Sequence, residues 1–308
     1  MAFELNLQGN CTSDTRGTGL GDCVKLYGDL MGIDLYAKGY SVSNVSGSLP
    51  TEVTYKTQIQ DGDVYPLNDL FTFEQNTPDN ETSTGSTGKL TEIRAGKPQY
   101  SITWDKGGCF HKALYDKRGK NRWDIAFKFE TGVLFATNVA EDELKAFNTG
   151  MFSPSTFKFL QGTDPEMSVA SFQFNTAVEL NQRSVFYTWD ALGFDMNLVE
   201  GVINVDASFE TAPTAALTAN VTVVDDCNRS VQILGLEVGD FTLGGVQATT
   251  TAISTAVYNV AGHYVLTFDA ALESGDTLQI TVAEAGSEAA ESTSGDLYKG
   301  ATPLVDIA

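Results

Sequence analysis

Histidine is nearly absent from this sequence: only His111 and His263 occur in 308 residues. Histidine is the side chain most often used for acid–base catalysis near neutral pH, so its scarcity limits that chemistry. His263 precedes a predicted strand, where a role in a turn or at an edge is the simpler interpretation. The sequence also lacks G-x-S-x-G, P-loop, dinucleotide-binding and zincin motifs. We therefore expect no catalytic residues and no enzymatic activity.

Cysteine is also sparse, and the four residues Cys11, Cys23, Cys109 and Cys227 are too few for a disulfide framework. We expect them to be reduced. Cys109-x-His111 offers two metal ligands that Cys11 and Cys23 would complete, but the spacing matches no structural zinc pattern. Acidic pairs elsewhere lack the spacing of the twelve-residue calcium loop. The sequence therefore predicts neither a metal site nor a cofactor.

Positive charge is scarce, with 19 basic residues against 40 acidic ones and a net charge of -21. A duplex-binding protein or one that binds an anionic membrane needs the opposite balance. The charge serves either solubility or an acidic surface past which DNA slides without sticking. The first residues, MAFELNLQGN, have no signal-peptide pattern, and no apolar run is long enough to cross a bilayer. We expect synthesis in the cytosol and no membrane partner.

The composition changes near residues 210–216. Residues 211–308 contain only two basic residues, Arg229 and Lys299, against twelve acidic ones. Seventeen basic and twenty-eight acidic residues, and all three tryptophans, fall in residues 1–210. This shift predicts two separately folded domains, 1–210 and 211–308.

Strand periodicity dominates the first domain. Residues 123–129 alternate apolar with other side chains, and 130–132 form a turn before a second strand at 133–137, which predicts a hairpin with one buried face. Further strands are predicted at 100–104, 156–160, 168–174, 185–188 and 202–209. A short helix is predicted at 140–147, where three carboxylates occupy the first turn. A weaker helix is predicted at 20–30.

The second domain shows short alternating runs separated by Gly and Asp turns. They lie at 219–224, 230–236, 241–243, 256–260, 264–268 and 277–282, with a last one at 304–307. About a hundred residues with this many short strands predict an immunoglobulin-like β-sandwich. The fold class is therefore all-β with minor α content.

Two segments stand out as candidates for binding. Residues 74–98 contain almost no large apolar side chain, so they form either a mobile loop or an arm that orders only against another subunit. Residues 106–122 are the one basic segment, flanked by Phe110, Tyr115 and Trp123 for base stacking. Because the chain is acidic overall, we favour a contact between this segment and the acidic face of a neighbouring subunit. Its basic residues are Lys112, Lys117, Arg118, Lys120 and Arg122.

The run WDIAFKFETGVLFATN, followed by AEDELKAFNTGMF and SFQFNTAVEL, resembles bacteriophage tail tube proteins. The opening LNLQGNCTSDTRGTGLGDCVKLYGDLMGIDLYAKGYSV is similar to virion proteins of Bacteroidetes phages. The resemblance implies a β-sandwich flanked by the helix at 140–147, followed by an accessory immunoglobulin-like domain as in lambda-type tail tubes. It also implies hexameric rings that stack into a tube through which DNA passes.

The resemblance further implies a location in the virion tail, after synthesis in the host cytoplasm. Its partners would be other copies of the chain and tail proteins such as the tape measure and terminator, with DNA as non-specific cargo. Stacking needs a second interface, for which we expect the 74–98 segment, with these contact residues: Asn76, Asp79, Asn80, Thr82, Thr84 and Lys89. Alternatives are a capsid decoration protein or a glycan-binding module that uses Trp104, Trp123 or Trp189.

Overall fold

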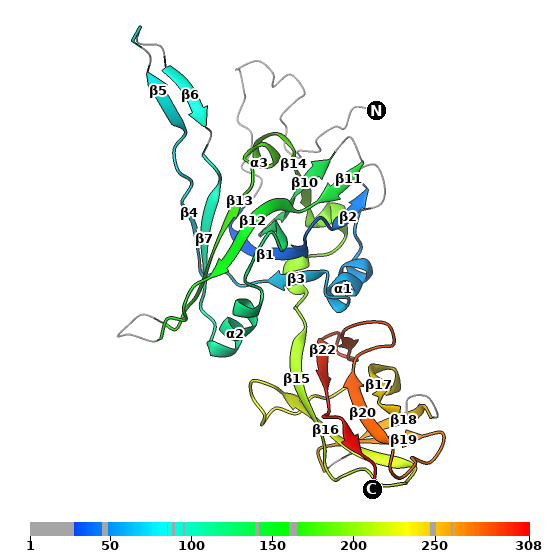
Figure 1. Cartoon of the computed structure of the whole chain (residues 1–308). Coiled ribbons are helices and arrows are strands. Elements are labelled where there is room, and N and C mark those ends of the chain that lie inside the picture. Colours follow the sequence, from blue (N-terminus) through cyan, green and yellow to red (C-terminus); the bar gives the residue numbers. More distant parts are fainter. Residues whose placement is uncertain are drawn as a thin grey trace. The chain divides into compact units, whose positions relative to one another are not determined.

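The computed structural model describes residues 28–44, 49–84, 86–87, 90–94, 96–138, 142–159, 165–246, 251–259 and 261–308. Within that part of the chain, strands account for 45% of residues and helices for 13%, which confirms the all-β class with minor α content. The chain divides into two compact units, Met1–Tyr55 with Asp63–Val199, and Lys56–Gly62 with Glu200–Ala308 (Figure 1).

The first unit is a 12-stranded sheet with a separate two-stranded ribbon. Its strands are β1 (Leu30–Ala37), β2 (Ser41–Asn44), β3 (Val64–Leu67), β4 (Thr72–Gln75), β5 (Glu81–Thr84), β6 (Leu90–Arg94), β7 (Gln99–Trp104), β8 (Gly119–Lys120), β9 (Trp123–Phe129), β10 (Gly132–Asn138), β11 (Glu143–Lys145), β12 (Phe147–Pro154), β13 (Ser168–Phe174) and β14 (Ser184–Thr188). The helices of this part of the chain are α1 (Glu52–Gln60), α2 (Gly108–Asp116), α3 (Val178–Gln182), α4 (Trp189–Leu192) and the 3-10 turn η2 (Met196–Leu198). The main path of the sheet runs β2-β11-β10-β9-β12-β13-β7-β4.

The predicted hairpin is confirmed as β9 and β10, which pair antiparallel with Leu134 opposite Phe127. The strand β9 was expected to bury one face, but both faces are buried. Phe127 belongs to an aromatic core on one face. The other face buries Lys128, which is completely inaccessible to solvent. The expectation of a half-buried strand is therefore wrong, because elements distant in the sequence cover the second face.

A buried ion pair lies under that second face. Lys128 Nζ is 2.7 Å from Asp34 Oδ1, and both side chains are fully buried. The Tyr55 hydroxyl donates to Asp34 Oδ2 at 2.8 Å, and Lys128 also donates to Asn68 Oδ1. Burial raises the pKa of the Asp34 carboxyl and lowers the pKa of Lys128, although the attraction between them opposes both shifts. The pair joins β1 to β9, which run antiparallel over most of their length.

The helix predicted at 140–147 is wrong. Glu143–Lys145 forms β11, which pairs with both β10 and β2, and β12 begins at Phe147. Leu144 and Phe147 are fully buried, so sheet packing overrides the local helix signal of the carboxylates. The expectation that the 123–137 sheet packs against this helix is wrong as well. Of the helix predicted at 20–30, residues 20–27 lie outside the described residues, and Leu30 begins β1.

Most other strands of the first unit follow the prediction. The strands predicted at 100–104, 168–174 and 185–188 correspond to β7, β13 and β14. The segment 156–160 contributes a single bridge, Lys158 to Met167, and residue 160 lies outside the described residues. The strand predicted at 202–209 forms, but in the second unit.

The second unit is a nine-stranded sheet in the order β17-β20-β22-β15-β16-β19-β18, with β21 and β23 at its side. Its strands are β15 (Ile203–Phe209), β16 (Thr218–Asp225), β17 (Phe241–Gly244), β18 (Ile253–Tyr258), β19 (Tyr264–Phe268), β20 (Thr277–Val282), β21 (Ala290–Glu291), β22 (Leu297–Ala301) and β23 (Val305–Asp306), with the 3-10 turn η3 (Val238–Asp240). The strand predicted at 230–236 is wrong, since only one bridge forms there, from Gln232 to Val224.

The division between the units falls at Val199 rather than at residue 210. The reason is that β15 pairs antiparallel with β16 and parallel with β22, both in the second unit. The change in composition near residues 210–216 lies after β15, which is the first strand of the second unit. It therefore does not coincide with the boundary between the units.

Candidate assembly surface

Four strands form one end of the first unit's sheet. In order they are β12, β13, β7 and β4, all antiparallel, and the short β8 pairs with the outer side of β12. Side chains alternate in burial along β7 and β13, so one face packs on the core and the other faces outward. Trp104 and Phe172 are buried on the core face.

The outward face of this sheet is polar and almost uncharged. The residues that alternate with the buried ones are Thr72, Glu74, Gln99, Ser101, Thr103, Met151, Ser153, Val169, Ser171 and Gln173. The strands β4, β7, β12 and β13 contain no lysine or arginine, and Glu74 is their only charged residue. Across these four strands the face has no group that would hold a phosphate.

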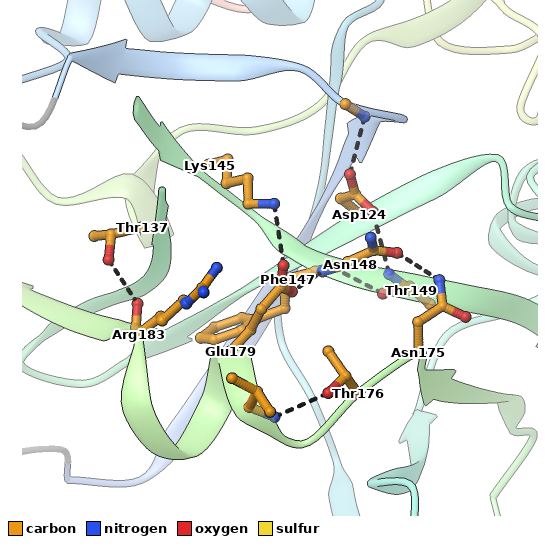
Figure 2. A network of polar contacts seen from close by, with 12 residues as sticks. Asp124, Thr137, Lys145, Phe147, Asn148, Thr149, Asn175, Thr176, Glu179 and Arg183 are labelled. Carbon is orange, nitrogen blue, oxygen red and sulfur yellow. Dashed lines mark hydrogen bonds and ion pairs between the residues drawn. The ribbon is translucent and has the colours of Figure 1, made fainter. Parts of the chain in front are cut away.

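A polar network fixes β12 where it leaves β9 and joins β13 (Figure 2). The Thr149 N–H donates to Asp124 Oδ1 at 3.1 Å, and the Asn148 N–H donates to Glu179 Oε2 at 2.7 Å. Glu179, on α3, also pairs with Lys145 Nζ at 3.0 Å. Asp124 and Glu179 are both buried, so these contacts are shielded from solvent. The network therefore holds the polar sheet in a fixed orientation on the rest of the unit.

A long two-stranded ribbon continues from β4 and β7 (Figure 1). The Asn76 N–H donates to Gln99 O at 2.8 Å, and the Gly96 N–H donates to Asn80 Oδ1 at 2.9 Å. Beyond them β5 and β6 pair, with Thr82 opposite Glu92. The hydrogen bonding is thus continuous from the sheet into the ribbon, and the expected structureless span at 74–98 is wrong. Residues 74–98 contain few large apolar side chains, but their threonine-rich strands still pair through their backbones.

The ribbon presents most of the predicted contact residues to solvent. Asn76, Asp79, Thr82 and Thr84 are exposed. The side chain of Asn80 is also exposed, but its oxygen already accepts the Gly96 N–H. The remaining predicted contact, Lys89, lies outside the described residues.

The basic segment forms α2, β8 and the turn between them. Lys112 on α2 and Lys120 on β8 are exposed. Lys117 Nζ lies 3.1 Å from the centre of the Tyr65 ring, and the Arg122 guanidinium lies 4.8 Å from the Trp123 ring. Cations this close to aromatic faces are attracted by the ring electrons. Lys117 and Arg122 are therefore held against their own subunit.

Arg118 is similarly occupied, because its Nη1 donates to the Tyr115 hydroxyl at 3.1 Å. Trp123 is 5% exposed and its indole N–H donates to Lys117 O at 2.6 Å. Its ring is therefore packed inside the subunit and not presented to a nucleobase. Trp104 is also buried, and Trp189 is partly buried on α4, so the tryptophans do not form an exposed glycan platform.

Histidine and cysteine do not gather into a site. Among the described residues no three His, Cys, Asp or Glu side chains are placed to share a metal. His263 is a buried turn residue whose Nδ1 lies 3.1 Å from Glu210 Oε2, and burial lowers the pKa of His111. Cys109 and Cys227 each take part in a disulfide bond, so the expectation of reduced thiols is wrong for these two.

Comparison with known proteins adds no identification. No protein-family model matches the sequence, and no curated protein matches it significantly. None of the helices in the described part of the chain is long and apolar enough to cross a membrane.

Proposed function

We propose that this chain is a structural protein that assembles with copies of itself into stacked rings, forming a tube of the phage-tail type for the passage of DNA. The observation that carries the proposal is the ribbon that extends β4 and β7. It is ordered by backbone pairing, and the side chains of Thr82, Ser83 and Thr84 on β5 are all exposed.

An isolated two-stranded hairpin is at best marginally stable in water, since it buries little apolar surface to offset its lost conformational entropy. Among the described residues β5 and β6 pair only with each other, and the ribbon meets the sheet near Gln75, which lies opposite Tyr100. A second copy of the protein lying against the ribbon would supply the missing contacts. A contact at the far end of such an arm links successive rings, because it reaches beyond the subunit that carries it.

The outward face of the sheet supports the DNA part of the proposal. A channel for DNA must not retain phosphates, and retention grows with each lysine or arginine that meets the backbone. The four strands β4, β7, β12 and β13 contain neither residue. We therefore assign this face to the lumen of the tube.

The proposal is tested by negative-stain electron microscopy of the full chain at high concentration. The wild-type protein should form rings and tubes with a central channel. A variant in which an Asn-Gly turn replaces residues 77–98, so that Asn76 still lies opposite Gln99, should form rings that do not stack. Circular dichroism and melting curves check that this variant folds.

Two outcomes would count against the proposal. A wild-type protein that stays monomeric at every concentration would contradict self-assembly. Tubes of unchanged length from the shortened variant would show that the ribbon does not join the rings.

A further inference from the structure

The sheet that carries the polar face ends in two dissimilar edges. Its strand order is β8-β12-β13-β7-β4, so β8 and β4 lie at opposite sides. Within the described residues, β4 pairs only with β7 and β8 pairs only with β12. An unpaired edge offers backbone donors and acceptors to another strand.

The edge at β4 has neither lysine, proline nor a bulge, and Glu74 is its one charged residue. Edge strands normally avoid association through lysine, proline or a bulge, whereas β4 has the sequence TFEQ and a regular register with β7. Phe73 stacks on Tyr100 with 5.2 Å between ring centres, yet it is 38% exposed. Phe71, just before β4, is 53% exposed. The aromatic layer of the core therefore reaches this edge and is left uncovered there.

The two edges carry opposite charges on the same face. Lys120 of β8 is paired with Met151 of β12. The same cross-strand row continues through Gln173 of β13 to Gln99 of β7. The next outward-facing row contains Ser153 of β12, Ser171 of β13 and Ser101 of β7. It ends at Glu74 of β4. Both Lys120 and Glu74 are exposed, and neither has an ion-pair partner among the described residues. The side chains of Lys120 and Glu74 therefore lie on the same face of the sheet, at its two opposite edges.

We infer that β4 of one copy pairs with β8 of the next, with Glu74 of one copy against Lys120 of its neighbour. This inference rests on the proposed self-assembly and specifies the contact that closes the ring. Because successive strands alternate in direction, β8 and β4 run the same way, so a head-to-tail neighbour meets β4 in parallel.

The rows of Glu74 and Lys120 are two residues apart, about 7 Å along a strand. Bringing the two side chains together therefore staggers each copy by that amount. Such a stagger is what closing a sheet into a barrel requires. Backbone pairing and burial of Phe73 supply the affinity, while the ion pair selects the register.

Charge reversal at the two edges tests the inference with the full chain. Glu74→Lys alone and Lys120→Glu alone each place like charges in the contact. Each should raise the protein concentration needed for ring formation by about tenfold or more, corresponding to roughly 1.4 kcal/mol. The double variant, which exchanges the charges, should assemble at a concentration close to that of the wild type. Glu273→Lys, an identical change at an exposed position of the second unit, is the matched control and should have no effect.

Native mass spectrometry of an equimolar mixture provides a second measurement. The two single variants are complementary to each other, so the mixture should form mixed oligomers that neither variant forms alone. Failure of both the double variant and the mixture to assemble, with folded monomers, would overturn the pairing. Normal assembly of either single variant would overturn it too, while wild-type tubes would leave the proposed function intact.

Discussion

The hydrophobic cores of the two units differ in composition. Each unit contains a cluster of eighteen buried residues, of which nine are aromatic in the first unit and four in the second. The first unit also buries the Asp34–Lys128 pair, which has no counterpart among the described residues of the second unit. The second core is mainly aliphatic, with residues such as Leu266 and Ile280.

Under the proposed assembly, the first unit must hold a defined shape, whereas the second needs only to stay folded. Buried ion pairs cost desolvation energy and add little net stability, but they restrict which arrangements satisfy both charges. In the first unit such a pair fixes β1 on β9, and the network at Asp124 fixes β12 on the same strand. These contacts orient the sheet whose edges we propose for assembly. The second unit shows no comparable buried ion pair in its described part.

The largest effect is expected from breaking the buried pair on one side. Lys128→Met leaves the Asp34 carboxylate without its partner in a fully buried site. The free energy of unfolding of the first unit should fall by about 3–5 kcal/mol. Differential scanning calorimetry should show the transition of the first unit moving to lower temperature, with that of the second unit unchanged.

Two further variants control this experiment. Lys112→Met makes the same substitution at an exposed position of α2 and should leave both transitions in place. The double variant Asp34→Asn with Lys128→Met removes both charges and keeps an acceptor for the Tyr55 hydroxyl, so most of the loss should be recovered. An equal loss in the double variant would show that shape, not the uncompensated charge, causes the effect.

A smaller effect is expected from a cavity in the other core. Leu266 is fully buried on β19, and Leu266→Ala should lower the free energy of unfolding of the second unit by about 3 kcal/mol. Ring assembly, followed by electron microscopy, should be unchanged while that unit is folded. Val257→Ala, at a position 58% exposed on the neighbouring β18, should have little effect and serves as the control. Loss of rings in the Leu266→Ala variant would show that the second unit takes part in assembly.

Local patterns were sufficient to predict the class of the fold and many of its strands. The alternation at 123–129 and the Gly132 turn predicted β9 and β10, because both signals lie within a few residues of each other. The helix at 140–147 failed for the opposite reason. Its carboxylates are a local signal, but Leu144 is buried in β11, which pairs with the neighbouring β10 and with β2 from a distant part of the sequence. A local helix preference is overridden where pairing with a strand distant in the sequence determines the structure.

The same limit applies to the candidate site. The sequence predicted that the 74–98 segment and Lys120 take part in contacts, and the structure exposes Lys120 and, of the predicted ribbon contacts, Asn76, Asp79, Asn80, Thr82 and Thr84. The proposed pairing of Lys120 with Glu74 was not predictable from the sequence, since their positions at opposite edges of one face depend on the order of five strands. Asp34 was likewise unpredictable as the partner of Lys128, because alternation in β9 places Lys128 on an outer face. Only the register of β1 against β9 brings the two charges together.

The smallest effect concerns the buried carboxylate of the second unit. Burial raises the pKa of Asp240, and the carboxylate of Glu284 raises it further, although the Glu237 N–H donates to it at 2.6 Å and opposes the shift. The folded unit therefore binds this proton more tightly than the unfolded chain, so ionised Asp240 lowers stability at neutral pH. Asp240→Asn keeps an acceptor for the Glu237 N–H and removes the charge. At pH 7 this variant should be slightly more stable than the wild type.

The difference should shrink as the pH falls through the raised pKa of Asp240 and vanish below the ordinary carboxyl range, where both forms are neutral. Urea unfolding of the full chain at pH 7 and at pH 3.5 measures this difference. Glu273→Gln, at an exposed site, should unfold like the wild type at both values. A variant less stable than the wild type at pH 7 would show that the hydrogen bond to the charged carboxylate outweighs the cost of burying it. The second unit would then, like the first, gain from a buried charge, and the contrast between the two cores would narrow to their aromatic content.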